Sequence, residues 1–181
     1  NLRALISIDP PRALDMLDHL NAYLRATLAA SRATLHPLQT EFDRLRDYLE
    51  LMSVRMGPRL QYTLDLPPEL ARLPVPALLL QPLVENAIQH GLEPKVAGGR
   101  ITVLARLNHE MLILEVSDTG VGFAPDNTPK GFGLTQVKER LATLYGTQGT
   151  IEFIANDAYM TSARVTFPYE NATPCQPTPA H

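Results

Sequence analysis

Residues 85–91 read Glu-Asn-Ala-Ile-Gln-His-Gly and close an apolar stretch, residues 77–90, whose pattern predicts a helix. Further along, residues 118–122 read Asp-Thr-Gly-Val-Gly and follow a run of strand-forming residues. Residues 131–134, Gly-Phe-Gly-Leu, then precede a second helical pattern. In this order the three motifs predict an amide on a helix, a carboxylate in a glycine-containing turn and a glycine-hinged loop around one pocket. A pocket of this kind suits a nucleotide.

The first motif offers polar side chains at the end of the predicted helix. Asn86 and His90 are one turn apart, are expected to share a face and are both candidate ATP-binding residues. Mg²⁺ takes oxygen ligands and often binds through one or two protein groups plus substrate phosphates, which makes Asn86 a candidate metal ligand. Glu85 is adjacent, and its role is open. A helix end that simply faces water is the alternative interpretation of this pair.

The second motif combines an acceptor with two small residues. The carboxylate of Asp118 can accept a hydrogen bond from an exocyclic amino group such as that of adenine. Gly120 and Gly122 would allow the backbone to lie against a base at positions where a Cβ atom would collide. An ordinary Asp/Gly turn is the alternative.

The third motif enters the helix predicted over residues 133–145. Helix N-termini present unpaired N–H groups that bind phosphates, and glycines allow the preceding loop to hinge over a ligand. Lys138 and Arg140 are either phosphate contacts or solvated charges. The chain contains no Gly-Lys-Ser/Thr sequence, so this is not a Walker-type loop. The predicted phosphate-side residues are Lys130, Gly131, Phe132, Gly133 and Leu134.

Composition restricts the classes of protein that the chain can represent. It has 181 residues, of which 45% are hydrophobic, enough for one domain with a proper core. A formal charge of −3 argues against a nucleic-acid partner, because there is no basic surplus to neutralise phosphates. The one cysteine excludes an internal disulfide, and no apolar run is long enough to span a bilayer.

The remaining patterns predict an α/β (α+β) two-layer sandwich, in which three helices cover one face of a mixed sheet. The domain is expected over residues 33–170, with a disordered tail over residues 171–181. A leucine stripe within residues 1–32 predicts a helix that either packs on the domain or, as we favour, forms a dimer interface. The expected helices and strands are residues 10–30, 42–56, 77–90 and 133–145, and residues 61–66, 101–107, 111–116, 151–154 and 163–167.

The motifs resemble those of a known family. Residues 78–91 resemble the N box of sensor histidine kinases of the LytS/YehU type, and residues 118–122 and 131–134 resemble their two glycine boxes. The resemblance implies a Bergerat-type ATP-binding fold shared with gyrase, Hsp90 and MutL ATPases. It further implies that Asn86 coordinates Mg²⁺, that Asp118 binds the adenine amino group and that Thr161 lies near the adenine.

The same resemblance implies a function. Such a protein binds Mg-ATP and transfers the γ-phosphate to a histidine, with Glu85 and Asn86 as catalytic residues, for onward transfer to a response regulator. The family's phosphoacceptor motif is absent from this sequence, so the chain alone is expected not to autophosphorylate. The implied partners are a second copy bound through the N-terminal helix, the response regulator and the phosphoacceptor helix of the parent protein.

The family also implies a parent protein anchored in the bacterial inner membrane, with this part on the cytoplasmic side. Two positions depart from the family pattern: Met160 replaces a glycine before Thr161, and Gln136 replaces an asparagine. The alternative is therefore a non-catalytic or differently targeted nucleotide-binding module, such as a serine-directed regulatory kinase or an ATP/ADP sensor.

Overall fold

The computed structural model describes residues 35–122, 132–157 and 160–169, together with positions 10, 11, 14 and 17. The helix predicted within residues 1–32, apart from those four positions, lies outside the described residues. So does the predicted tail, residues 171–181.

Five strands form one mixed sheet in the order β2-β4-β5-β7-β6. The edge strand β2 runs parallel to β4, and the other neighbours are antiparallel. The strands are β2 (Leu60–Asp65), β4 (Gly99–Asn108), β5 (Met111–Asp118), β6 (Thr150–Asp157) and β7 (Met160–Pro168).

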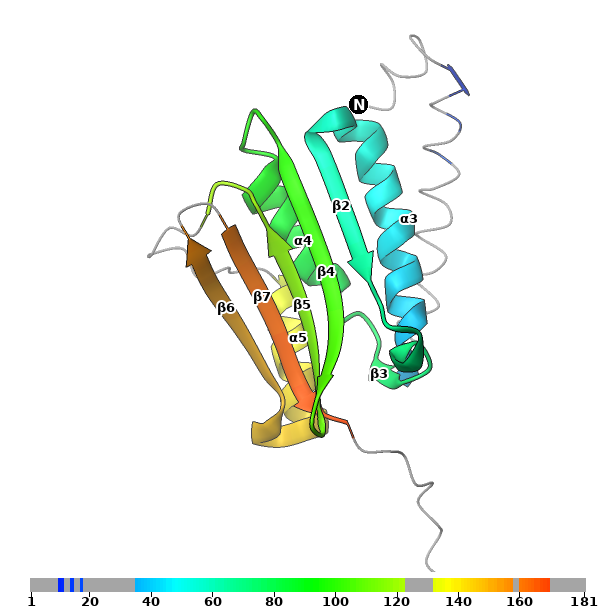
Figure 1. Cartoon of the computed structure of the whole chain (residues 1–181), viewed down its shortest axis with the longest axis vertical. Coiled ribbons are helices and arrows are strands. Elements are labelled where there is room, and N and C mark those ends of the chain that lie inside the picture. The colour runs from blue at the N-terminus through cyan, green and yellow to red at the C-terminus, as the bar shows by residue number, and fades with distance from the viewer. Residues whose placement is uncertain are drawn as a thin grey trace, which may run out of the picture.

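The helices pack on one side of this sheet, with α3 beside the edge strand β2 (Figure 1). Among the described residues, none of the helices combines the length and apolarity that crossing a bilayer needs. The predicted mixed sheet with three helices is confirmed. The helical segments are α3 (Leu38–Met56), α4 (Gln81–Asn86), the π-helix η3 (Ala87–Leu92), α5 (Phe132–Tyr145) and the short turns η1 (Gly57–Arg59), η2 (Pro68–Leu70) and η4 (Gly146–Gln148). A small separate ladder pairs β1 (Leu35–Pro37) with β3 (Pro74–Pro76).

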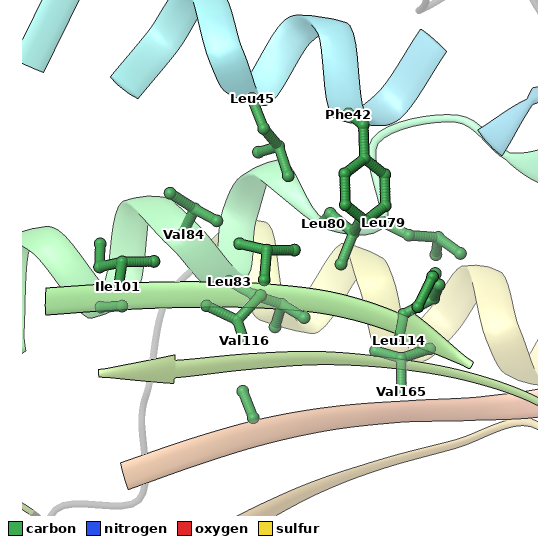
Figure 2. Packing of buried hydrophobic residues seen from close by; sticks show 14 of the residues in the cluster. Phe42, Leu45, Leu79, Leu80, Leu83, Val84, Ile101, Leu114, Val116 and Val165 are labelled. Carbon is green, nitrogen blue, oxygen red and sulfur yellow. The ribbon is translucent and has the colours of Figure 1, made fainter. Parts of the chain in front are cut away.

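The core lies between the helices and the sheet. Figure 2 shows Phe42 and Leu45 of α3 above Leu83 and Val84 of α4, with side chains of the sheet below them. Gly57 ends α3 at a φ of 60°. The apolar face of this helix is buried throughout and consists of Phe42, Leu45, Leu49, Met52 and Met56. This burial fixes α3 against the rest of the domain.

The helix predicted over residues 77–90 is wrong at its start, because regular helix begins only at Gln81. Leu78 has a φ of 60°, which a right-handed helix does not accommodate. Pro82 therefore lies in the first turn, where its missing N–H breaks no hydrogen bond, rather than inside the helix as a kink. The helix continues to Leu92 as one turn of π-helix, a distortion that often marks functional sites.

Candidate nucleotide-binding site

Asp118 is the last residue of β5 and lies on the buried face of the sheet. Side chains alternate along a strand, so Asp118 shares this face with Val116, and it is 7% exposed. Its Oδ1 accepts a hydrogen bond of 2.9 Å from the backbone N–H of Gly120. Thr161 of β7 is the directly opposite residue in the antiparallel ladder. Such pairs place their side chains on one face, so the two residues that were predicted to meet adenine are neighbours.

The end of the first motif touches the turn of the second. A Cβ atom added to Gly91 would lie 2.5 Å from Oδ1 of Asp118, and one added to Gly120 would lie 2.3 Å from the backbone carbon of Gly91. The N–H of Val121 donates to the carbonyl of Gly91 over 3.0 Å. Any side chain at these two glycines would separate the motifs. Gly91 ends the first motif, but the sequence pattern indicates no role for it.

The third motif packs on the helix of the first. A Cβ atom at Gly133 would lie 3.0 Å from Cβ of Pro82, and Leu134 is buried beside it. Thus α5 begins against the first turn of α4. Phe132 is the first residue of α5, while Lys130 and Gly131 lie outside the described residues. Gly122, with a φ of 79°, closes the described part of the turn.

The predicted metal and catalytic residues lie at the end of α4. Asn86 is its last residue and is half-buried, while His90 is exposed on η3. Oε1 of Glu85 accepts a hydrogen bond of 2.8 Å from Nε2 of Gln81. Within the described residues no group of three His, Cys, Asp or Glu side chains could hold a metal. A single amide oxygen on Asn86 fits an ion that takes its other ligands from phosphates and water.

Lys95, which lies outside the three motifs, stabilises the turn that follows Asp118. Nζ of Lys95 donates to the carbonyls of Thr119 and Gly120, the latter over 3.1 Å. Nη2 of Arg59 in turn donates to the carbonyls of Glu93 and Lys95, over 3.3 and 2.8 Å. These contacts join η1, the short turn after α3, to the turn that follows Asp118. No sequence signal pointed to Lys95, because its partners are carbonyls that any sequence supplies.

Comparison with protein families assigns the chain. Residues 75–171, which contain all three motifs, match the model of the histidine kinase-, DNA gyrase B- and HSP90-like ATPases. The chain belongs to this ATPase family. Residues 1–60 match a second model, that of histidine kinases. ATP is the nucleotide that this ATPase domain uses.

Two curated relatives of the chain are a sensor histidine kinase and a sensor protein. Sensor histidine kinase BtsS of Escherichia coli (strain K12) is 31% identical over 145 residues, which are 80% of this chain and 26% of that protein. Sensor protein LytS of Oceanobacillus iheyensis is 27% identical over 184 residues, 94% of this chain and 31% of that protein. The chain thus spans between a quarter and a third of each relative.

A solved structure agrees with the fold of the ATPase domain. Histidine kinase AdeS of Acinetobacter baumannii superposes with a TM-score of 0.60 at 20% identity, over 88% of this chain and 81% of that one. Identity at this level supports the fold alone.

Ionisation of the buried Asp118 carboxylate in the ATPase domain costs free energy. Burial raises its pKa above the ordinary value of 3.8, and this outweighs the opposing effects of the Gly120 N–H and the Lys95 charge. Because the folded protein holds the proton more tightly than the unfolded chain, stability falls as the pH rises from 3.8 through the raised pKa. The ionised form of Asp118 therefore lowers the stability of the folded domain at neutral pH.

We expect Asp118→Asn to raise the melting temperature of the nucleotide-free ATPase domain near pH 7. The amide keeps an oxygen for the Gly120 N–H and removes the buried charge. The gain should shrink towards zero as the pH falls through the raised pKa, because the native carboxyl is then neutral as well. Thermal unfolding of both proteins at several pH values measures the difference. A melting temperature that drops at neutral pH would show that the charge stabilises the fold.

Proposed function

We propose that this chain is the catalytic ATP-binding part of a two-component sensor histidine kinase, transferring the γ-phosphate of ATP to a histidine for onward transfer to a response regulator. The curated relatives that support this are all sensor proteins or sensor histidine kinases. They favour the kinase over a differently targeted or non-catalytic nucleotide-binding module.

The observation that carries the proposal is the direct contact between the motifs. Gly91 at the end of the first motif meets Asp118 and Gly120 of the second, and Gly133 of the third meets Pro82 of the first. Three segments that are far apart in the sequence therefore lie around one candidate site. The buried carboxylate of Asp118 lies at one end of this site, and the start of α5 lies at the other.

In this proposal the nucleotide lies between Asp118 and the start of α5. Asp118 accepts a hydrogen bond from the adenine amino group, and Thr161 lies beside it. Gly122 leaves the surface of the turn flat for the base, whereas Gly120, which was expected to do the same, instead lets the turn approach Gly91. On the phosphate side, Lys130 supplies charge and the N-terminal amides of α5 supply donors, within the segment Gly131, Phe132, Gly133 and Leu134.

The chemistry proposed for α4 is mainly positioning and neutralisation of charge. Asn86 would hold Mg²⁺, which neutralises phosphate charge when bound. Glu85, already fixed by Gln81, would accept a hydrogen bond from the ring N–H of the incoming acceptor histidine. The other ring nitrogen would bond to the γ-phosphorus while the bond to the ADP oxygen breaks.

We extend the proposal to the parent protein's partners. A second copy would bind through the N-terminal segment, which matches the histidine kinase model together with α3. The phosphoacceptor helix would come from the same parent protein, which we place at the cytoplasmic face of the bacterial inner membrane. We propose residues 1–32 as the dimerisation part and residues 33–170 as the catalytic domain.

Calorimetric titration with Mg²⁺ and a non-hydrolysable ATP analogue tests the proposed site. We expect saturable binding that Asp118→Asn weakens by at least about tenfold, or roughly 1.4 kcal/mol. The substitution replaces a carboxylate oxygen, which can accept a hydrogen bond from the adenine amino group, with an NH₂ group, which can only donate. It also removes the negative charge of Asp118. Equal binding by both proteins would contradict the adenine role of Asp118, and no binding by either would contradict the kinase proposal.

A further inference from the structure

The segment that precedes α4 is held by a buried carboxylate from another helix. Glu41 of α3 is 2% exposed. Its Oε1 accepts from the N–H of Leu78 over 2.9 Å, and its Oε2 accepts from the N–H groups of Leu79 and Leu80 over 2.9 and 3.0 Å. Three consecutive backbone donors thus converge on one side chain that is far away in sequence.

The side chains of His36 and Arg44 complete the surroundings of this carboxylate. Nε2 of His36 lies 2.9 Å from Oε1 of Glu41, and Nη1 of Arg44 lies 3.4 Å from the same oxygen. Burial raises the pKa of Glu41, but the contacts with His36 and with the backbone of Leu80 and Leu78 together hold it below 4.5. Glu41 is therefore an anion at neutral pH, and its hydrogen bonds are the strong charge-assisted kind.

The Glu41 carboxylate stabilises a backbone conformation of residues 78–80 that the sequence pattern did not predict. Leu78 has a φ of 60°, in the left-handed region that L-residues rarely adopt. If Glu41 did not accept from them, the N–H groups of the buried Leu79 and Leu80 would lose these partners. Figure 2 shows Phe42, next to Glu41, extending from α3 towards the segment that carries Leu79 and Leu80.

The same segment is held on its other side by the helix of the third motif. Nη1 of Arg140 in α5 donates to the carbonyl of Ala77. This residue, which we considered as a phosphate contact, instead binds backbone at the junction. Residues 77–80, which lead into α4, thus form hydrogen bonds with side chains of both α3 and α5.

We propose that Glu41 is a positioning residue of the nucleotide site, which sets the start of α4 and thereby the place of Asn86 and Glu85 at its end. This inference rests on the proposed function. It assigns to α3, which follows the segment predicted to dimerise, a direct polar connection to the proposed metal-binding end of the site. The adenine end has contacts of its own, those of Lys95 with the turn and of Gly91 with Asp118.

Glu41→Gln tests the role, because it keeps the shape but presents an NH₂ group to N–H donors. Asp43→Asn is the matched control, since Asp43 is an exposed carboxylate of the same helix. Two quantities are measured for each protein: amide hydrogen exchange at Leu79 and Leu80, and binding of an ATP analogue with Mg²⁺ beside binding of adenosine, followed by NMR.

We expect Glu41→Gln to lose protection at both amides and to bind the Mg²⁺–ATP analogue about tenfold more weakly, while adenosine affinity changes less than about twofold. Asp43→Asn should match the wild type. Unchanged exchange and affinity, or equal loss for both ligands as general loosening would give, would overturn the inference. If Glu41→Gln fails to fold, Glu41→Asp, which keeps the charge on a shorter side chain, should show the same selective loss.

Failure of the proposed function is distinguishable from failure of this inference. A wild-type protein that binds neither ligand refutes the nucleotide site. The exchange measurement then still decides whether Glu41 holds the start of α4, because it requires no ligand.

Discussion

Gly120→Ala is expected to lower the free energy of unfolding by about 3 kcal/mol and to abolish most binding of an ATP analogue. The new Cβ would lie 2.3 Å from the backbone carbon and 2.4 Å from the carbonyl oxygen of Gly91. Backbone cannot rotate away as a flexible side chain can, so the turn and η3 must separate. That separation also moves Asp118, which lies against Gly91. Chemical denaturation and calorimetry measure the two effects.

Gly146→Ala is the matched control for this prediction. Gly146 has a φ of 58° but nothing within 4 Å of an added Cβ, so alanine meets only the left-handed strain. We expect a loss of about 1–2 kcal/mol and unchanged nucleotide affinity. If both variants lost the same stability and both still bound the analogue, the close contact between the two motifs would not matter for the site.

Asn86→Ala should remove the Mg²⁺-dependent part of nucleotide binding, a loss of about tenfold to a hundredfold. The proposed ion has one protein oxygen, so truncation leaves it to phosphates and water alone. Alanine favours helix, and Asn86 is only half-buried at the end of α4, so the fold should persist. Titrations of the ATP analogue with and without Mg²⁺ isolate this effect.

Gln89→Ala is the control, since Gln89 is exposed on the adjoining π-helix η3. It should bind like the wild type under both conditions. A loss in Asn86→Ala that is equally large without Mg²⁺ would mean that Asn86 contacts the nucleotide itself or supports the helix, and the metal assignment would be wrong.

Local pattern was enough to predict most elements of this domain. The apolar stripe of α3 is periodic over enough residues to identify a helix and its buried face, and the strand-forming run over residues 111–116 identifies β5. Asp118 could be placed at a strand end on the same grounds. The predicted start of this helix was wrong. The apolar composition of residues 77–80 favours helix, whereas in the structure Glu41 accepts hydrogen bonds from the N–H groups of residues 78–80 in another conformation.

The sequence by itself determined the sandwich fold and the identity of the three motifs, because periodicity and glycine spacing are local properties of the chain. Only the tertiary structure decided which residues hold the site together. The contact of Gly91 with Asp118, the hold of Lys95 on the turn and that of Glu41 on Leu78–Leu80 join segments that are distant in sequence. Their partners are mostly backbone groups, which every residue carries, so no sequence pattern reveals them.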